Sequence, residues 1–141
     1  TIRHEKMSVL ASPDYLIKHP VATPAELINH ALILSESPLI QWPQWFAAMQ
    51  LAQPTKDWLF RFDRSYMSLE AARLGHGVVF ESELLAAEYL RSGTLVRVFG
   101  DECSLPVNAH HLVWPRGFAR FPRVSHFLQW SSEQLEASPP A

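Results

Sequence analysis

Residues 61–80, RFDRSYMSLEAARLGHGVVF, predict the central unit of the fold. The segment 59–62 alternates with aromatic residues, which is typical of a strand. Residues 66–74 carry apolar side chains at helical spacing, and Gly75 stands where a glycine commonly ends a helix. The apolar run 78–80 then suits a buried strand. The stretch therefore predicts a β-α-β unit, whose helix carries these apolar residues: Met67, Ala71 and Leu74.

Short polar side chains flank the start of this helix, at Asp63 and Ser65. Both residue types cap helices by accepting hydrogen bonds from free backbone N–H groups, and we expect capping here. The same end of the helix lies at the carboxyl edge of the sheet, where open α/β sheets bind ligands and N–H groups favour a carboxylate. Asp63 and Ser65 thus have two possible roles, capping and ligand binding. Arg64 either adds charge to this site or is an ordinary exposed arginine.

Strand and helix patterns alternate on both sides of this unit, which predicts an α/β fold with a largely parallel sheet. Residues 1–6 are polar and predict an irregular lead-in, and residues 138–141 predict a frayed tail. The further expected strands are 7–11, 31–34, 95–99 and 108–114, and the further expected helices are 14–18, 23–29, 42–52, 83–91 and 122–136.

The chain resembles the effector-binding domain of LysR-type transcriptional regulators over about residues 7–135. The central stretch has that family's F-D-x-S motif, an apolar helix, and A-A-x-x-G-x-G before a Val-rich strand. Other segments resemble family motifs in the same order along the chain. They are 9–16 (VLASPDYL), 19–20 (HP), 23–27 (TPAEL), 42–45 (WPQW), 90–96 (LRSGTLV) and 121–130 (FPRVSHFLQW).

The resemblance implies an α/β effector domain of the type 2 periplasmic-binding-protein kind, present as a fragment. Such domains have two lobes joined by crossover strands. By the resemblance, residues 7–117 form the second lobe and residues 118–137 the C-terminal helix of the first lobe. No segment here resembles the helix-turn-helix DNA-binding domain of such regulators. Contact with DNA is therefore expected only through that missing N-terminal domain.

The function implied by the resemblance is effector sensing. The domain would bind a small-molecule inducer, anionic or amino-acid-like, and thereby control DNA binding by the absent helix-turn-helix domain. A homo-oligomer in the cytoplasm is expected for the full-length regulator, with no cofactor and no membrane partner. The alternative is a solute-binding protein of the type 2 periplasmic fold, which shares the architecture. The sequence upstream would distinguish the two, by a helix-turn-helix or a signal peptide.

Effector contacts are expected at two further places besides Ser65, Asp63 and Arg64. Trp42 and Trp45 are three residues apart and so lie on one helical face. Aromatic walls of this kind suit small ligands. Core packing is the alternative for them. The resemblance places this segment at the cleft, so Trp42 and Gln44 are predicted to line it. The resemblance also implies an effector contact at His110.

Neither a metal site nor catalysis is expected. His110 and His111 are strand neighbours whose side chains point to opposite faces, so they do not share an ion. The acidic neighbours of Cys103, at positions 101 and 102, disfavour its thiolate. No serine has the G-x-S-x-G context of a nucleophile elbow, and no nucleophile stands beside a base. We therefore predict no catalytic residue and no enzyme activity.

Composition sets the remaining bounds. The chain has 141 residues, of which 48% are hydrophobic, and this suits one domain with a substantial core. Its net charge is −2, without a basic stripe, which argues against nucleic-acid binding by this part itself. One cysteine excludes an internal disulfide. No apolar run approaches the roughly 18 residues of a membrane span.

The final helix, 122–136, carries an apolar stripe whose usual partner would be the missing first lobe. Several such side chains left in water would make a patch that monomers rarely tolerate. We therefore predict that this helix finds another partner, either its own second lobe or a neighbouring copy. The stripe comprises Val124, Phe127, Leu128 and Leu135, with Trp130 beside it.

Overall fold

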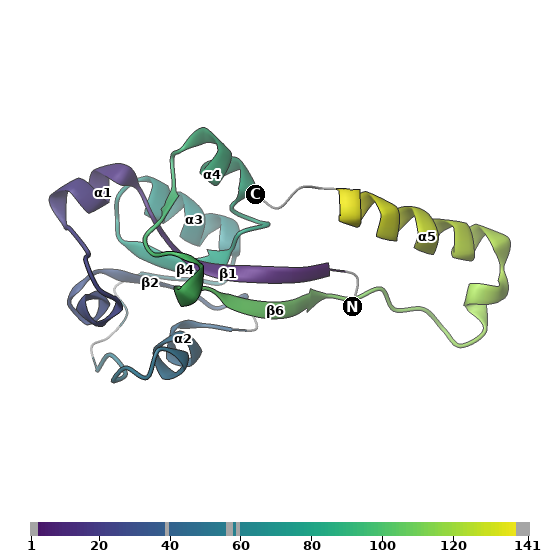
Figure 1. Cartoon of the computed structure of the whole chain (residues 1–141), viewed down its shortest axis with the longest axis horizontal. Helices are drawn as coiled ribbons and strands as arrows, with labels where there is room; N and C mark the ends of the chain where they lie inside the picture. The colour runs from purple at the N-terminus through teal and green to yellow at the C-terminus, as the bar shows by residue number, and fades with distance from the viewer. Residues whose placement is uncertain (1–2, 39, 56–57, 59, 138–141) are drawn as a thin grey trace.

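The computed structural model describes residues 3–38, 40–55, 58 and 60–137. Within these residues, a mixed sheet carries helices on both of its faces, and a long C-terminal helix stands apart from it (Figure 1). The strands are β1 (Arg3–Ala11), β2 (Leu32–Ser35), β3 (Phe60–Phe62), β4 (Val78–Ser82), β5 (Val96–Arg97) and β6 (Leu105–His110). The α-helices are α1 (Pro13–Lys18), α2 (Trp42–Ala48), α3 (Ser65–Arg73), α4 (Ala87–Ser92) and α5 (Pro122–Ala137), and the 3-10 helices are η1 (Pro24–Asn29), η2 (Asp101–Cys103) and η3 (Phe118–Arg120).

The strand order is β3-β2-β4-β1-β5, and β6 also pairs with β1. Strand β2 is parallel to β3 and β4, whereas β1 is antiparallel to β4, β5 and β6. The prediction of a largely parallel sheet was therefore wrong. Strand direction depends on which strands pair over long sequence distances, and the local apolar pattern does not encode it.

The predicted β-α-β unit is present. Strands β3 and β4 run parallel with β2 between them, and α3 connects them across one face of the sheet. Gly75 follows α3 in the left-handed conformation, with φ of +82°, as expected for a helix-ending glycine. Gly77 lies against β2, where an added Cβ would be 2.2 Å from the carbonyl oxygen of Ala31. A glycine is therefore required where the chain enters β4.

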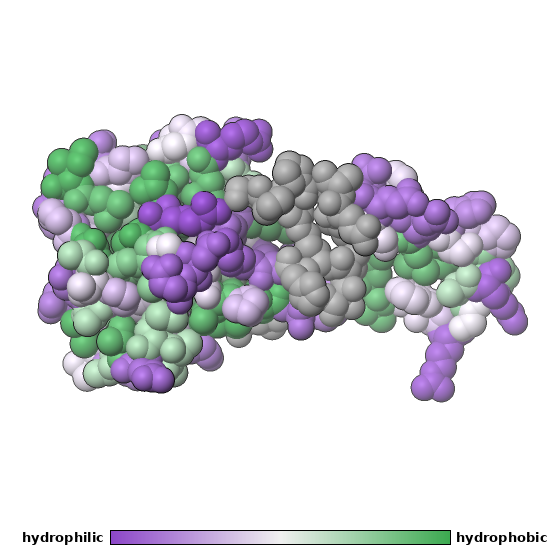
Figure 2. All heavy atoms as spheres, in the orientation of Figure 1, coloured by the Kyte–Doolittle hydropathy of each residue, from purple (hydrophilic) through white to green (hydrophobic). Residues whose placement is uncertain are grey.

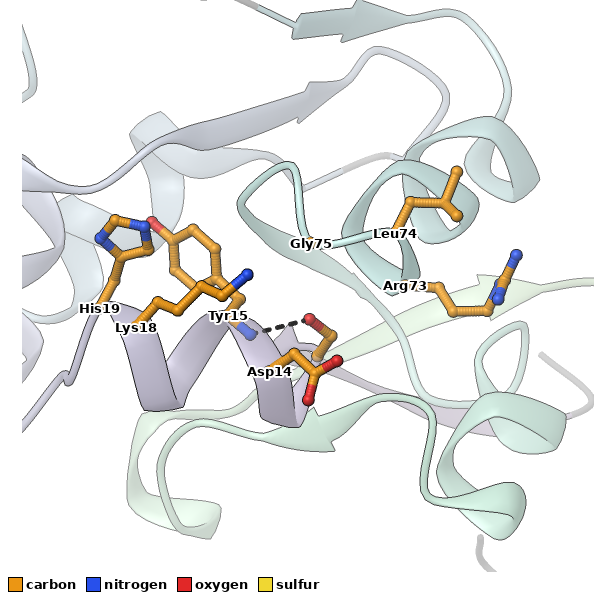
Figure 3. Close-up of a pocket in the computed structure, with 8 residues that line it drawn as sticks. Asp14, Tyr15, Lys18, His19, Arg73, Leu74 and Gly75 are labelled. Carbon is orange, nitrogen blue, oxygen red and sulfur yellow. Dashed lines mark hydrogen bonds between the residues drawn. The ribbon is translucent and has the colours of Figure 1, made fainter.

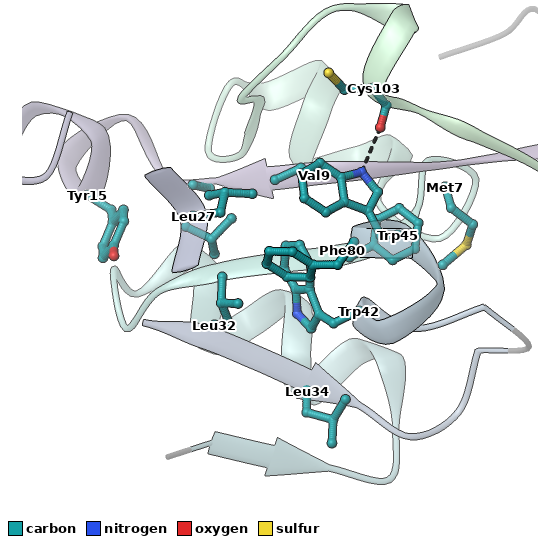
Figure 4. Packing of buried hydrophobic residues seen from close by; sticks show 13 residues of the cluster. Met7, Val9, Tyr15, Leu27, Leu32, Leu34, Trp42, Trp45, Phe80 and Cys103 are labelled. Atoms are coloured by element: carbon teal, nitrogen blue, oxygen red, sulfur yellow. Dashed lines mark hydrogen bonds between the residues drawn. The ribbon is translucent and has the colours of Figure 1, made fainter. Parts of the chain in front are cut away.

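Apolar side chains fill both faces of the sheet. On one face, α2 inserts Trp42, Trp45 and Phe46 against β1, β2 and β4, and the indole Nε1 of Trp45 donates to the carbonyl oxygen of Cys103 at 2.8 Å (Figure 4). On the other face, α3 packs Leu69 and two alanines against the sheet. The strands are buried on both sides, which explains their nearly continuous apolar runs.

Several predicted boundaries differ from the structure, including the start of α4, at Ala87 instead of residue 83, and the end of α2, at Ala48 instead of residue 52. Strand β1 already begins at Arg3, so the expectation of an irregular lead-in was wrong for residues 3–6, and residues 1–2 lie outside the described residues. The last strand is 105–110 instead of 108–114. Both differences have one cause: the polar first half of β1 pairs with β6, where Glu5 lies opposite Val107. The predicted strand 95–99 is short, at 96–97. The predicted tail, 138–141, lies outside the described residues.

Helix α5 projects away from the sheet and its helices (Figure 1). Its described aromatic residues lie largely in solvent, with Phe127 52% and Trp130 56% exposed, and hydrophobic atoms are visible on the surface of this part of the molecule in Figure 2. Among the described residues, α5 has no extended contact with the sheet or with the helices that cover it, so its own lobe is not its main partner here. Among the described residues, no helix is both long and apolar enough to cross a membrane.

Candidate functional site

The carboxyl ends of the parallel strands form one edge of the sheet, which we call the carboxyl edge. Strands β2, β3 and β4 end there at Ser35, Phe62 and Ser82. Helix α3 begins three residues after β3, so its N-terminus lies at this edge. Because β1 is antiparallel to β4, the first half of β1 reaches the same edge. At this edge, the first half of β1 and its partner β6 extend beyond the ends of the parallel strands (Figure 1).

The first turn of α3 is not capped by a side chain. Its N-cap residue is Arg64, and neither Asp63 nor Ser65 accepts a hydrogen bond from the helix, so the capping prediction was wrong. Ser65 is already the first helical residue, and its hydroxyl is badly placed to cap its own helix. The backbone N–H groups of Ser65 and Tyr66 find no acceptor among the described residues. This end of α3 therefore presents two free donors and a partial positive charge.

The three predicted residues at this turn lie close together. Asp63 and Arg64 are exposed and form an ion pair, with 3.3 Å between Nη1 and Oδ2. Ser65 is half-buried beside them. They are accessible to a ligand that approaches the N-terminus of α3, as the binding prediction requires.

A row of buried polar side chains lies on the α3 side of the sheet, near its carboxyl edge. Ser8 is paired with Glu81 across β1 and β4, and the β2–β4 register, continued by two residues, sets Ser35 beside Glu81 on the same face. Ser68 is a buried residue of α3, the helix that packs on this face. The Oγ atoms of Ser35 and Ser68 and the Oε1 atom of Glu81 are buried and have no hydrogen-bond partner in the described structure. Glu81 Oε2 accepts from the backbone N–H of Ser82 at 3.0 Å.

A second buried acid at this edge, Glu83, has hydrogen-bond partners for both of its carboxylate oxygens. Both of its oxygens accept from the Arg97 guanidinium at 2.6 Å, and Ser8 Oγ donates to Oε1 at 2.6 Å. Burial by itself would raise the pKa of Glu83, but the hydrogen bonds from Arg97 and Ser8 and the positive charges of Arg97 and Lys6 outweigh burial and lower it. Glu83 therefore holds β1, β4 and β5 together as a charged group.

His110 lies near one border of the sheet, because its strand β6 pairs with β1. The strand that precedes α3, β3, forms the opposite border. The Nε2 of His110 is 2.6 Å from Oε2 of the buried Glu5. The Nε2 of His111 instead lies 3.0 Å from the carbonyl oxygen of Asn108. No cluster of three or more possible metal ligands occurs among the described residues.

Trp42 and Gln44 lie on the opposite face of the sheet from α3. Trp42 is 1% exposed, and its Nε1 donates to the carbonyl oxygen of Ile33 at 2.8 Å. The structure thus places Trp42 in the core, the alternative that the sequence left open. Gln44 is exposed, and its side chain accepts from the backbone N–H of Gln41 in a capping box. Any effector contact by these two residues stays a prediction.

A small cavity of about 140 Å³ lies elsewhere, between α1 and the C-terminal end of α3 (Figure 3). Polar and basic side chains line it, Lys18 and Arg73 among them. Because it lies at the other end of α3 from Ser65, it is separate from the carboxyl edge. The thiol of Cys103 is also remote from the N-terminus of α3, and burial, followed by the charge of Glu102, raises its pKa, as the sequence predicted for a thiol beside acids.

The sequence-based prediction missed the buried polar row and the acids at positions 81 and 83. One signal pointed to them: two glutamates interrupt the apolar run of β4 just where the strand ends. Charged side chains at the end of a buried strand need partners, and such positions are candidates for a site. The hydroxyls of Ser35 and Ser68 gave no such signal, because the sheet register places Ser35 and the packing of α3 places Ser68 on the side of the sheet that carries Glu81.

Comparisons with known proteins identify the family. A family model for the LysR substrate binding domain matches residues 1–136. The HTH-type transcriptional regulator PerR of Escherichia coli is 34% identical over 132 residues, which cover 93% of this chain and 43% of PerR. The uncharacterized HTH-type transcriptional regulator y4mQ of Sinorhizobium fredii is 32% identical over 128 residues, which cover 90% of this chain and 42% of y4mQ. The chain thus spans less than half the length of these relatives.

Solved structures agree with these matches. The effector domain of the transcriptional regulator AmpR of Pseudomonas aeruginosa superposes with a TM-score of 0.76 at 27% identity, over 96% of this chain and 63% of that one. The regulatory domain of CrgA from Neisseria meningitidis has the same fold, with a TM-score of 0.70. The α/β effector-domain fold, present as a fragment, is confirmed, as is the prediction that the chain is not an enzyme, since its relatives are transcriptional regulators. The chain belongs to the LysR substrate-binding domain family.

Proposed function

We propose that this chain is the effector-sensing part of a LysR-type transcriptional regulator and that it binds a small anionic or amino-acid-like inducer at the carboxyl edge. The observation that carries the proposal is its likeness to the effector domain of AmpR over 96% of the chain. The free N–H groups at the start of α3 support it, because a helix N-terminus stabilises a bound carboxylate. Ser65 contacts the effector, with Asp63 and Arg64 beside it.

The proposed division of the chain follows the family. Residues 7–117 are the second lobe, and residues 118–137 return to the first lobe, most of which precedes this chain in a longer protein. The effector lies between the lobes and favours one arrangement of a cytoplasmic homo-oligomer. A helix-turn-helix domain outside this chain then meets its operator differently. The relatives found are regulators, so they give no support to the alternative of a solute-binding protein.

The test is a mobility-shift assay on a full-length regulator that contains this chain, with its own promoter DNA and a panel of amino acids and small organic acids. We expect at least one compound to change the affinity or the pattern of the complex. The 141-residue chain alone serves as the control and should form no specific complex, because it has a net charge of −2. Normal DNA binding that no compound alters would contradict effector sensing.

A further inference from the structure

We infer that the effector carries a positively charged hydrogen-bond donor, such as an ammonium group, in addition to any anionic group. This inference rests on the proposed function and names the chemical class of the effector. It follows from the pairing of acids with basic side chains at the carboxyl edge, where the buried acid Glu81 has no basic partner among the described residues.

Four other acids around the edge have basic partners. Asp63 pairs with Arg64, and Glu36 at the end of β2 pairs with Arg61. Glu83 is bound by Arg97, and Asp101 is bound by Lys6 at 2.7 Å. These four pairs leave no basic side chain at the edge for Glu81, which forms no ion pair within the described residues.

Glu81 is the acid for which a partner is most needed. It is 0% exposed, so water does not solvate its carboxyl group, and its Oε1 has no donor in the described structure. An unpaired polar atom in the interior costs about 1–3 kcal/mol, and a buried charge without a counter-charge costs more. A bound cationic donor would relieve this cost. The site therefore favours a ligand that brings one.

The neighbours of Glu81 fit the same ligand chemistry. The hydroxyls of Ser35 and Ser68, 4% and 0% exposed, are also without partners. Together with Glu81 Oε1 they are three buried oxygen acceptors without a donor, and strand register and the burial of Ser68 on α3 put all three residues on the α3 side of the sheet. An ammonium group has three N–H donors and no acceptor, which matches such a set.

The free N–H groups of Ser65 and Tyr66 supply the complementary half of the site. They favour an anionic group at the start of α3, directly after the exposed turn. A ligand that carries both a carboxylate and an ammonium group, as an α-amino acid does, satisfies the two features together. Because Ser68 and Glu81 are 0% exposed, an ammonium group reaches them only when the residues that cover them move aside.

The donor could also come from a basic side chain in the part of the effector domain that lies outside this chain. The two sources give different results in binding experiments. A ligand ammonium makes affinity depend on the amino group of the ligand, whereas a protein side chain already satisfies Glu81 in the free protein. In the second case the amino group of the ligand has no special effect.

The experiment is isothermal titration calorimetry on the full-length regulator. The probes are the common α-amino acids in both enantiomers and, for each one that binds, the matching carboxylic acid without the amino group. We expect loss of the amino group to weaken binding about tenfold or more, which is the effect of one hydrogen bond to a charged group. Equal affinity for the deaminated acid, or no binding by any amine-bearing probe, overturns the inference.

The substitution Glu81→Gln tests the residue itself, with Glu88→Gln as the matched control, because Glu88 is an exposed acid paired with Arg91 on α4. We expect Glu81→Gln to remove the preference for the amino group and Glu88→Gln to keep it. An unchanged preference in Glu81→Gln overturns the inference. If Glu81→Gln does not fold, the probe series on the unaltered regulator decides the matter. Selective binding of amino acids that leaves DNA binding unchanged upholds this inference and contradicts the proposed function.

Discussion

The Oε2 atom of Glu5 lies 2.6 Å from Nε2 of His110, and this contact joins the first strand of the sheet to the last. Glu5 is 7% exposed, and its other oxygen has no partner in the described part of the chain. The two residues are 105 positions apart in sequence. The contact therefore links β1 to the end of β6, just before the chain leaves the sheet toward α5.

Replacing His110 should destabilise the chain. His110→Ala leaves the buried carboxyl group of Glu5 without its side-chain partner, and we expect a loss of about 1–3 kcal/mol in the free energy of unfolding. His111→Ala, at an exposed position, should change stability by less than about 0.5 kcal/mol. Urea denaturation of the two variants measures the difference. Equal losses would mean that the Glu5 contact contributes nothing of its own.

Acid should weaken the chain partly through Glu83. Because the pKa of Glu83 is lowered in the folded state, its contribution to stability is complete above the pKa of an unfolded glutamate, about 4.3, and is lost as the pH falls through the lower folded value. Glu83→Gln should therefore lower the free energy of unfolding at neutral pH by about 1–2 kcal/mol, since Arg97 is partly exposed. The gap between variant and unaltered chain should narrow below about pH 4. A gap that is independent of pH would refute this role.

Gly77 should not tolerate alanine. An added Cβ would meet the carbonyl oxygen of Ala31 at 2.2 Å, and that oxygen already accepts from the N–H of Val78 at 2.8 Å. We expect Gly77→Ala to cost more than about 3 kcal/mol, because β2 must move away from β4. Gly93→Ala is the control: Gly93 also has a positive φ, of +73°, but nothing lies within 4 Å of its added Cβ. Its expected cost is about 1 kcal/mol. Similar thermal shifts for both variants would remove the steric argument.

Ser65 should affect the effector response more than stability. In a full-length regulator, Ser65→Ala removes a hydroxyl at the start of α3 that caps no helix, so we expect basal DNA binding to persist. The loss of one hydrogen bond to a charged effector should shift the dose–response curve to about ten- to a hundredfold higher concentrations. Ser92→Ala, an exposed serine on α4, should leave the curve unchanged. An unaltered curve for Ser65→Ala would remove Ser65 from the site.

Helix α5 should bind another surface. Burial of one large apolar side chain contributes about 1.5–3 kcal/mol to the free energy of association. Phe127 and Trp130 are both more than half exposed, and their ring centroids are 5.9 Å apart. We expect light scattering across a dilution series to show association of the 141-residue chain, and Phe127→Glu to reduce it. Ser132→Glu, an exposed change on the same helix, should not. A strict monomer with a fully formed α5 would contradict the argument.

Local chemistry in the sequence was enough to predict the β-α-β unit and several helix ends. Gly75 and Gly93 both end helices in the left-handed conformation, and Pro122 opens α5, as expected from their backbone preferences. These features depend on residues a few positions apart. The F-D-x-S stretch and the other family motifs were likewise readable in order along the chain, and the family assignment that they indicated is confirmed.

Only the packing of distant segments determined the rest. The direction of β1 and the position of β6 follow from hydrogen bonds between strands about a hundred residues apart, which leave no local periodic signal. The sequence left Trp42 either lining the effector cleft or packing in the core, and only the position of α2 decided that it is buried on the face away from α3. Likewise, Ser35, Ser68 and Glu81 are unremarkable in the sequence. The register of β2 and β4 sets Ser35 beside Glu81, and α3, which carries Ser68, packs on the same face. A buried polar atom lacks a partner only where the fold removes its water.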